Sequence, residues 1–245
     1  MRTYEMMKKF AIVRTLPVWV LGAFLSINTA LANTEVALDK APIDPSDQAS
    51  LQRGAKVFVN YCLNCHSANY MRYNRLLEIG LTEMQIKENL LFAGEKVGDT
   101  MKVAMDKNDA QKWLGAAPPD LSVEVRARGA DWVYSYMRGF YRDDTRPTGW
   151  NNTVFDKVGM PHILYELQGE QVMNHETHKL ELHKPGKMSV AEYDATVADL
   201  TNFMAFMAEP AKQTRHQLGW FVLLFLALLA VLSYKLKKAY WRDVH

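Results

Sequence analysis

The chain has 245 residues, 49% of them hydrophobic and 23% charged, which excludes disordered and collagen-like classes and fits one domain with appendages. The formal net charge is +2, but residues 33–217 hold 21 basic and 25 acidic side chains, a net charge of −4. Nucleic-acid binding needs a basic face, so we expect no nucleic-acid partner. With only two cysteines, a scaffold held together by several disulfides is also excluded.

The first 32 residues have the pattern of a cleaved export signal. Basic side chains come first, at Arg2, Lys8, Lys9 and Arg14. The apolar stretch from Leu16 to Ile27 is about 12 residues long, too short for a permanent anchor across roughly 30 Å of hydrocarbon. Ala30-Leu31-Ala32 then places small residues at the spacing of a cleavage site. We therefore expect residues 1–32 to be removed.

A first helix is predicted from Asp47, after a polar lead-in over residues 33–46. Apolar side chains recur on one helical face, at Leu51, Ala55, Phe58 and Cys62. The helix ends in Cys62-Leu63-Asn64-Cys65-His66, the C-x-x-C-H arrangement of covalent c-type haem attachment. Thiols three residues apart share one face, where they can add to the two vinyl groups of one haem. His66 is then placed under the iron, so we expect one covalent haem c.

Three other interpretations of this motif are weaker. A thioredoxin-like redox pair needs a strand before the motif, whereas a helix precedes it here. A zinc site needs about four ligands, and only three cluster in this segment. A disulfide between Cys62 and Cys65 fits an oxidising compartment, but it leaves His66 and the loop-rich remainder of the domain unexplained.

The middle of the chain combines long loops with short helices. Thr82-Glu83-Met84-Gln85 is a capping box that predicts a short helix. Residues 93–121 are rich in glycine and proline and are expected to be mostly loop. Within them, the Ala117-Pro118-Pro119-Asp120 turn is a candidate acceptor for the second N–H of the His66 imidazole.

Two arginines precede the next predicted helix. Haem propionates need cationic or backbone donors, so Arg126 and Arg128 are candidates for that contact, with a solvated pair as the alternative. Asp131 is expected to cap a helix that runs to Tyr141, with one apolar side formed by Val133, Tyr136, Met137 and Phe140.

The haem iron needs either a second axial ligand or an open position. Of 13 methionines, Met160 stands in Gly159-Met160-Pro161, inside a turn-rich segment over residues 142–162. The glycine permits close approach of the backbone, and the proline holds the preceding residue extended. We therefore favour Met160 as the second ligand, with a packing role as the alternative. Core positions are expected instead for Met137, Met204 and Met207.

The last part of the exported segment predicts a small hairpin and a long helix. Residues 163–186 contain short alternating stretches that favour a hairpin. Ser189-Val190-Ala191-Glu192 is a second capping box. The helix that it opens carries an apolar stripe at Val190, Tyr193, Val197, Leu200, Met204 and Met207.

Leu218 to Tyr234 contains no charged residue and predicts a transmembrane helix of about 25 Å, extended by the snorkelling stem of Lys235. More basic residues follow this run than precede it, which places the C-terminus in the cytoplasm. The predicted organisation is a signal peptide over 1–32, a periplasmic haem domain over 33–210, a linker over 211–217, a transmembrane helix over 218–234 and a cytoplasmic tail over 235–245.

In combination, these motifs make the chain resemble cytochrome c1, the haem subunit of the cytochrome bc1 complex, in its bacterial form. The resemblance covers nearly all of residues 47–242. The segments that carry it are Cys62-x-x-Cys65-His66, Pro118-Pro119-Asp120-Leu121-Ser122, Arg126-Ala127-Arg128, Asp131-x-Val133-x-Ser135, Gly159-Met160-Pro161 and Ala208-Glu209-Pro210.

The resemblance implies a mainly α fold: a class I cytochrome c-like haem domain with long insertions and a small β-hairpin, plus one C-terminal transmembrane helix. It implies that His66 and Met160 ligate the iron, that Arg128 contacts a propionate, and that the segment containing Pro119 packs on the haem. Trp113-Leu114-Gly115 stands where many relatives carry Asn-Gly, so the contacts of that loop stay open.

The resemblance also implies an electron-transfer subunit of ubiquinol–cytochrome c reductase, with no bond-making catalytic group of its own. Electrons would come from the Rieske iron–sulfur protein, in a complex with cytochrome b, and pass to a soluble or membrane-bound cytochrome c. The domain's negative charge would favour a basic acceptor. The expected location is the inner membrane, with a single pass through the lipid bilayer. The alternative is a membrane-anchored haem enzyme or sensor with an open sixth coordination position.

Overall fold

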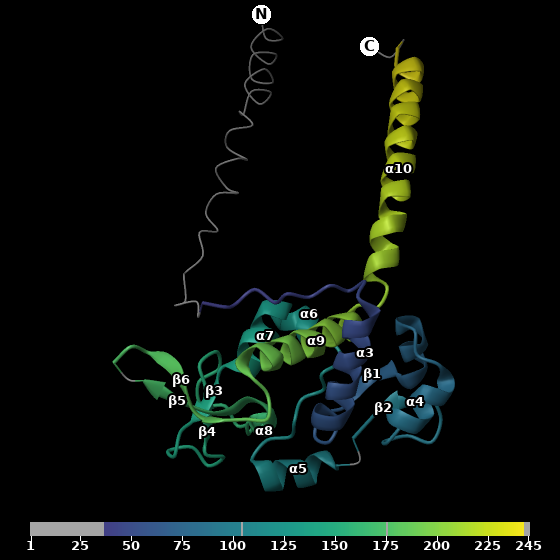
Figure 1. Cartoon of the computed structure of the whole chain (residues 1–245). Coiled ribbons are helices and arrows are strands. Elements are labelled where there is room, and N and C mark those ends of the chain that lie inside the picture. The colour runs from purple at the N-terminus through teal and green to yellow at the C-terminus, as the bar shows by residue number, and fades with distance from the viewer. Residues whose placement is uncertain (1–36, 104, 175, 243–245) are drawn as a thin grey trace, which may run out of the picture. The chain divides into compact units, whose positions relative to one another are not determined.

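The computed structural model describes residues 37–103, 105–174 and 176–242 (Figure 1). The signal peptide predicted over residues 1–32 lies outside the described residues. Helices dominate the described part, so the mainly α fold class is confirmed. The elements up to residue 138 are α3 (Gln48–Val57), the π-helical turn η2 (Phe58–Cys62), β1 (Ala68–Arg72), the 3-10 helix η3 (Tyr73–Ile79), α4 (Glu83–Asn89), β2 (Thr100–Met101), α5 (Lys107–Leu114), α6 (Glu124–Arg128) and α7 (Ala130–Arg138). They are followed by β3 (Phe140–Arg142), β4 (Trp150–Asn152), α8 (Tyr165–Gln168), β5 (Gly169–Asn174), β6 (Lys179–Pro185), α9 (Val190–Ala208) and α10 (Lys212–Tyr240).

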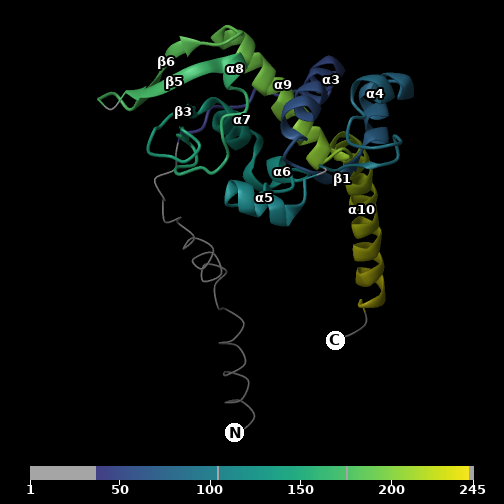
Figure 2. The same cartoon turned by 90° about the horizontal axis from the view of Figure 1, so that it is seen from below.

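Two helices far apart in the sequence, α3 and α9, cross in direct contact (Figures 1 and 2). Gly54 makes this crossing possible, because a Cβ atom at that position would stand 2.0 Å from the backbone oxygen of Asp199. The fully buried rings of Phe58 and Phe203 pack beside it with their centroids 5.6 Å apart. The crossing therefore holds α3 at the point where it leads into the cysteine motif.

Both capping boxes predicted from the sequence are present. Thr82 accepts a hydrogen bond from the backbone of Gln85, whose side chain bonds back to the cap, and Ser189 and Glu192 make the same exchange at the start of α9. The apolar stripe of α9 is buried from Tyr193 onward. Val190, in the first turn, is 62% exposed and lies outside the core.

The helix predicted from Asp131 begins earlier and ends sooner, because α7 starts after Gly129, whose φ of 94° marks the turn into it. No side chain caps this helix. The carboxylate of Asp131 instead accepts a hydrogen bond from the backbone N–H of Ala41, with a nitrogen-to-oxygen distance of 2.8 Å. The capping role predicted for Asp131 is therefore wrong, and this side chain holds the polar lead-in against α7.

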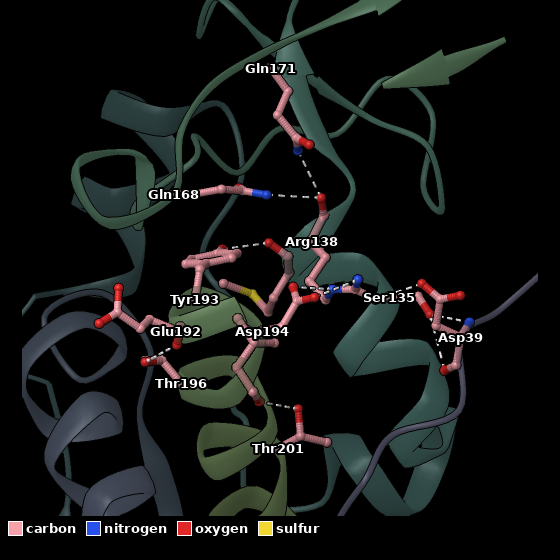
Figure 3. Close-up of polar contacts among 12 residues, drawn as sticks. Asp39, Ser135, Arg138, Gln168, Gln171, Glu192, Tyr193, Asp194, Thr196 and Thr201 are labelled. Carbon is pink, nitrogen blue, oxygen red and sulfur yellow. Dashed lines mark hydrogen bonds and ion pairs between the residues drawn. The ribbon is translucent and has the colours of Figure 1, made fainter. Parts of the chain in front are cut away.

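The C-terminal end of α7 is fixed against α9 by one arginine (Figure 3). Two nitrogens of the Arg138 guanidinium bond to the carboxylate of Asp194, at 2.6 and 2.9 Å, and the third bonds to Asp39 at 2.6 Å. Paired charge-assisted bonds of this kind set orientation as well as contributing energy. Beside them the hydroxyl of Tyr193 donates to the backbone oxygen of Met137 at 2.8 Å. Several separate hydrogen bonds thus hold α7 and α9 together at this point.

Among the described residues, three two-stranded antiparallel sheets accompany the helices: β1–β2, β3–β4 and β5–β6. The pair β5–β6 is the hairpin predicted within residues 163–186, with a bulge between Glu170 and Gln171. Gly169 enters it with a φ of 96°, where a Cβ would stand 2.2 Å from the backbone oxygen of Lys184. The other two sheets were not predicted from the sequence.

The helix α10 contains the predicted membrane span. Its segment Thr214–Tyr240 has a mean hydropathy of 2.1 in an 18-residue window and is long and apolar enough to cross a membrane. At about 1.5 Å per residue, its 27 residues reach about 40 Å, against roughly 30 Å of hydrocarbon. Since α10 begins at Lys212, most of the segment predicted as a linker is helical.

Candidate haem site

The cysteine motif begins where α3 unwinds. After the π-helical turn, the backbone oxygen of Cys62 accepts hydrogen bonds from the N–H groups of Cys65, at 3.1 Å, and His66, at 2.9 Å. This turn gathers the three side chains at one helix end. Both thiols are free in the described part of the chain, so the Cys62–Cys65 disulfide considered above is not formed here.

The thiol of Cys62 is buried. Burial, with a smaller effect from Cys65, raises the pKa of the Cys62 thiol to about 12, so that it stays neutral at physiological pH. Zinc is held by thiolates, which this environment disfavours. Within the described ranges, no three His, Cys, Asp or Glu side chains are grouped so as to hold a metal ion. Within those ranges, the zinc interpretation therefore has no geometric support.

The imidazole of His66 is oriented by the proline turn. Its Nδ1 lies 2.8 Å from the backbone oxygen of Pro119, the acceptor region predicted from the sequence. Burial lowers the pKa of His66, although the Pro119 bond acts in the opposite sense, so the ring is neutral. With the proton assigned to Nδ1 by this bond, the lone pair on Nε2 is left for a metal.

The turn that supplies this acceptor is itself held in place. The carboxylate of Asp120 accepts from the backbone and side chain of Asn69, at 2.8 and 2.7 Å, and from the backbone of Ser122 at 2.9 Å. Burial would raise the pKa of Asp120, but these hydrogen bonds outweigh it and lower the pKa. The backbone N–H of Leu121 also donates to Ser67 at 2.9 Å, one residue beyond His66. The Pro119 carbonyl is thus fixed relative to the motif.

Met160 belongs to a second group of contacts, centred on α7. Its half-buried side chain packs against the core, and its sulfur accepts a hydrogen bond from the hydroxyl of Tyr136 at 3.5 Å. The Tyr136 ring stacks on Trp132, with centroids 4.8 Å apart and planes 11° apart, and meets the edge of Phe140 at 5.1 Å. Burial raises the pKa of Tyr136 far above neutrality, so its hydroxyl remains a proton donor.

The methionines predicted to be core residues are buried: Met137, Met204 and Met207 are 5%, 4% and 6% exposed. The sulfur atoms of these three methionines are packed in the core. Met160 is different because its thioether lies in a loop and meets a polar hydrogen. The ligand role of Met160 stays a prediction.

Arg128 joins the α7 group. Its guanidinium pairs with Glu124 and lies over the rings of Trp132, at 4.4 Å, and Phe155, at 5.8 Å. The Glu124 carboxylate acts electrostatically on both His66 and Tyr136, so α6 borders both groups of contacts. The structure thus brings Arg128 close to the environment of Met160. The propionate contact predicted for Arg128 remains a prediction.

The residues present fit a covalently attached haem. They supply two free thiols, an imidazole fixed through Nδ1, a thioether and a guanidinium. The ring of Phe155, which is 47% exposed, lies beside the Arg128 guanidinium. A flat, mostly apolar ring with two carboxylates would satisfy this set of groups better than a bare metal ion would.

Two contacts in this site were missed from the sequence. The sequence assigns Tyr136 only to the apolar face of its helix, and it assigns no role to Trp132. A sequence signal was available, since Trp132 and Tyr136 are four positions apart and therefore lie on one face of the predicted helix. In the segment left open above, Trp113 lies in the last turn of α5 and is 70% exposed.

A helical domain with this C-x-x-C-H turn, joined to an apolar helix, defines a membrane-anchored c-type cytochrome. Residues 39–244 match the model of the cytochrome C1 family. The chain is 52% identical to cytochrome c1 of Allochromatium vinosum over 219 residues, 85% of this chain and 90% of the relative. It is 56% identical over 211 residues to a Nitrosomonas europaea protein called ammonia monooxygenase gamma subunit, with 86% and 90% covered. It is 31% identical to cytochrome c1 of Rhodospirillum rubrum, with 81% and 83% covered.

The chain therefore belongs to the cytochrome c1 family. The sequence-based prediction of this family is confirmed, and with it the role as the haem subunit of a bc1 complex. Membership implies covalently bound haem c, and Cys62 and Cys65 stand where the haem-binding motif is expected.

Proposed function

We propose that this chain carries one haem c, bound through Cys62 and Cys65, with His66 and Met160 as its axial ligands. The observation that supports this most directly is the His66 imidazole, fixed by Pro119 at the end of the C-x-x-C-H turn. The haem supplies one-electron chemistry. The protein's residues hold it, orient the imidazole, place a thioether and offer the Arg128 guanidinium to a propionate, while the segment around Pro119 packs on the ring.

The number of axial ligands on the haem iron distinguishes an electron carrier from a haem enzyme or sensor. A histidine–methionine pair raises the reduction potential and closes the iron to small molecules, which suits electron transfer. An open sixth position would suit the alternative of a haem enzyme or sensor. The Met160 thioether supports the carrier, because its side chain is only half-buried at the edge of the core and lies in a loop, where its sulfur can serve as a ligand.

The proposed partners are cytochrome b and the Rieske iron–sulfur protein within the complex, and a soluble or membrane-bound cytochrome c as acceptor. Basic residues that follow the apolar run of α10 support a cytoplasmic C-terminus and a periplasmic haem domain. The net charge of −4 on residues 33–217 supports a basic acceptor, guided by electrostatic steering.

Attachment is tested on the full chain, purified in detergent from cells that mature c-type cytochromes. After denaturation, the colour should stay with the polypeptide, and Cys62→Ala with Cys65→Ala should abolish it. A colourless wild-type protein contradicts the proposal.

Ligation is tested by the spectrum of the oxidised protein. Met160→Leu should remove the sulfur-to-iron charge-transfer band and let the reduced protein bind carbon monoxide. Met188→Leu is a matched control, because the Met188 sulfur also accepts a hydroxyl hydrogen bond at 3.5 Å, from Thr196. An unchanged spectrum in Met160→Leu would reject the ligand assignment.

A second candidate comes from the Nitrosomonas europaea relative, whose name makes it a subunit of an ammonia monooxygenase. Purification of the tagged full chain from its native membranes separates the two. Copurified quinol–cytochrome c reductase activity, together with a b-type haem, supports the bc1 complex. Copurified ammonia oxidation without either would support the second candidate.

A further inference from the structure

The hydroxyl of Tyr136 is aimed at the sulfur of Met160. The distance of 3.5 Å is that of a hydrogen bond to a thioether, and the phenol is the donor, since a thioether has no hydrogen to give. The ring has little freedom to turn away, because it lies between the stacked Trp132 and the edge of Phe140. The helix that carries it is fixed at its end by Arg138 (Figure 3).

We propose that Tyr136 tunes the haem through this bond: its hydroxyl withdraws electron density from the Met160 sulfur and thereby raises the reduction potential of the bound iron. The inference rests on the proposed function, in which Met160 is the axial ligand. It assigns to Tyr136 a role that goes beyond packing. Tyr136 is a positioning residue, since it acts on the iron through Met160 alone.

The direction of the effect follows from the sulfur's two lone pairs. One lone pair is donated to the iron and the other accepts the Tyr136 hydrogen. A hydrogen bond to the second pair makes the sulfur a poorer donor. Ferric iron depends on that donation more than ferrous iron does, so the bond favours the reduced state. When one electron arrives from the reduced donor, ferric iron becomes ferrous, and the phenol keeps its proton throughout.

The low polarity of the surroundings strengthens the effect. Tyr136 packs against the core together with Trp132, and Phe140 is fully buried. Tyr136→Phe removes the hydroxyl alone, so the sulfur of the variant would lose this donor and keep its electron density. The ring, its stacking and the shape of the core would all remain.

The test compares Tyr136→Phe with wild type as full-length haem proteins in the same detergent, by spectroelectrochemical titration. A hydrogen bond of ordinary net strength predicts about a fivefold shift of the oxidised-to-reduced ratio toward oxidised at a fixed solution potential. For a one-electron couple this is a midpoint about 40 mV lower, at 59 mV per tenfold. Tyr134→Phe is the matched control, because Tyr134 is buried on the same helix and packs instead under Arg138.

The charge-transfer band of the oxidised protein separates this inference from the proposed function. If wild type lacks the band, the Met160 ligand is refuted and the inference with it. If wild type and Tyr136→Phe both show the band, a lower potential in Tyr136→Phe alone supports the inference. An unchanged potential, an equal fall in Tyr134→Phe, or loss of the band in Tyr136→Phe overturns it, the last because the hydroxyl would then place the sulfur rather than tune it.

Discussion

Gly54→Ala is expected to destabilise the domain by about 2 kcal/mol, because the added methyl group meets backbone at the crossing of α3 and α9. The new Cβ would stand 2.0 Å from the Asp199 oxygen and 2.7 Å from the Cβ of Phe203. Backbone atoms cannot rotate aside as a flexible side chain does. The two helices must therefore separate.

The magnitude follows from two opposing effects. Overpacking a well-filled contact costs about 1–3 kcal/mol, and a rigid backbone obstacle places this site at the upper end. Alanine is favoured over glycine within a helix by about 1 kcal/mol, which offsets part of that cost. For a domain of this size, a net 2 kcal/mol lowers the melting temperature by about 4–8 °C.

The assay is thermal unfolding of the full haem protein in detergent, followed by haem absorbance and by near-ultraviolet circular dichroism. Gly98→Ala is the control, since no atom lies within 4 Å of the position that its Cβ would take. Its melting temperature should stay close to that of wild type. A Gly54→Ala protein as stable as wild type would refute the account of the crossing.

Three further predictions concern single hydrogen-bonding groups. Ser189→Ala should destabilise the protein by about 1 kcal/mol through loss of the α9 cap, whereas Ser189→Asp, which keeps an acceptor, should not, and equal melting temperatures for the two variants would contradict this. Tyr193→Phe leaves the buried carbonyl of Met137 without its partner and should cost about 1–2 kcal/mol by denaturant titration; no change would mean that water replaces the hydroxyl. Because folding lowers the pKa of Asp120, its carboxylate stabilises the protein above about pH 4 and loses this effect as the pH falls further. The difference in unfolding free energy between wild type and Asp120→Asn should therefore close in acid. A difference that stays constant from pH 7 to 3 would contradict this.

Local signals carried the sequence-based predictions that succeeded. A capping box such as Ser189–Glu192 lies within four residues, and the C-x-x-C-H turn lies within five. The prediction for Asp131 failed because its true partner, Ala41, lies 90 residues away. The sheet β1–β2 was not predicted for a similar reason, since β2 has only two residues and pairs with a strand almost 30 positions earlier.

In the haem site, too, local contacts could be predicted from the sequence and long-range contacts could not. The turn at Pro119 could be proposed as the acceptor for His66, because proline-rich turns are recognisable and their carbonyls are free. The bond from Tyr136 to Met160 could not, because it depends on how a loop folds back on α7. Spacing places Tyr136 on a helical face but does not say which loop covers that face.

The bonds from the lead-in to α7 restrict where the mature chain can begin. The backbone N–H of Asp39 donates to Ser135 and its carboxylate pairs with Arg138, while Ala41 bonds to Asp131. The cleavage predicted after Ala32 would keep every residue that makes these contacts. Any further trimming past Asp39 would remove partners of the helix that supports Met160. Loss of the lead-in would therefore weaken the support of α7, although Asp39 and Arg138 lie 99 positions apart in the sequence.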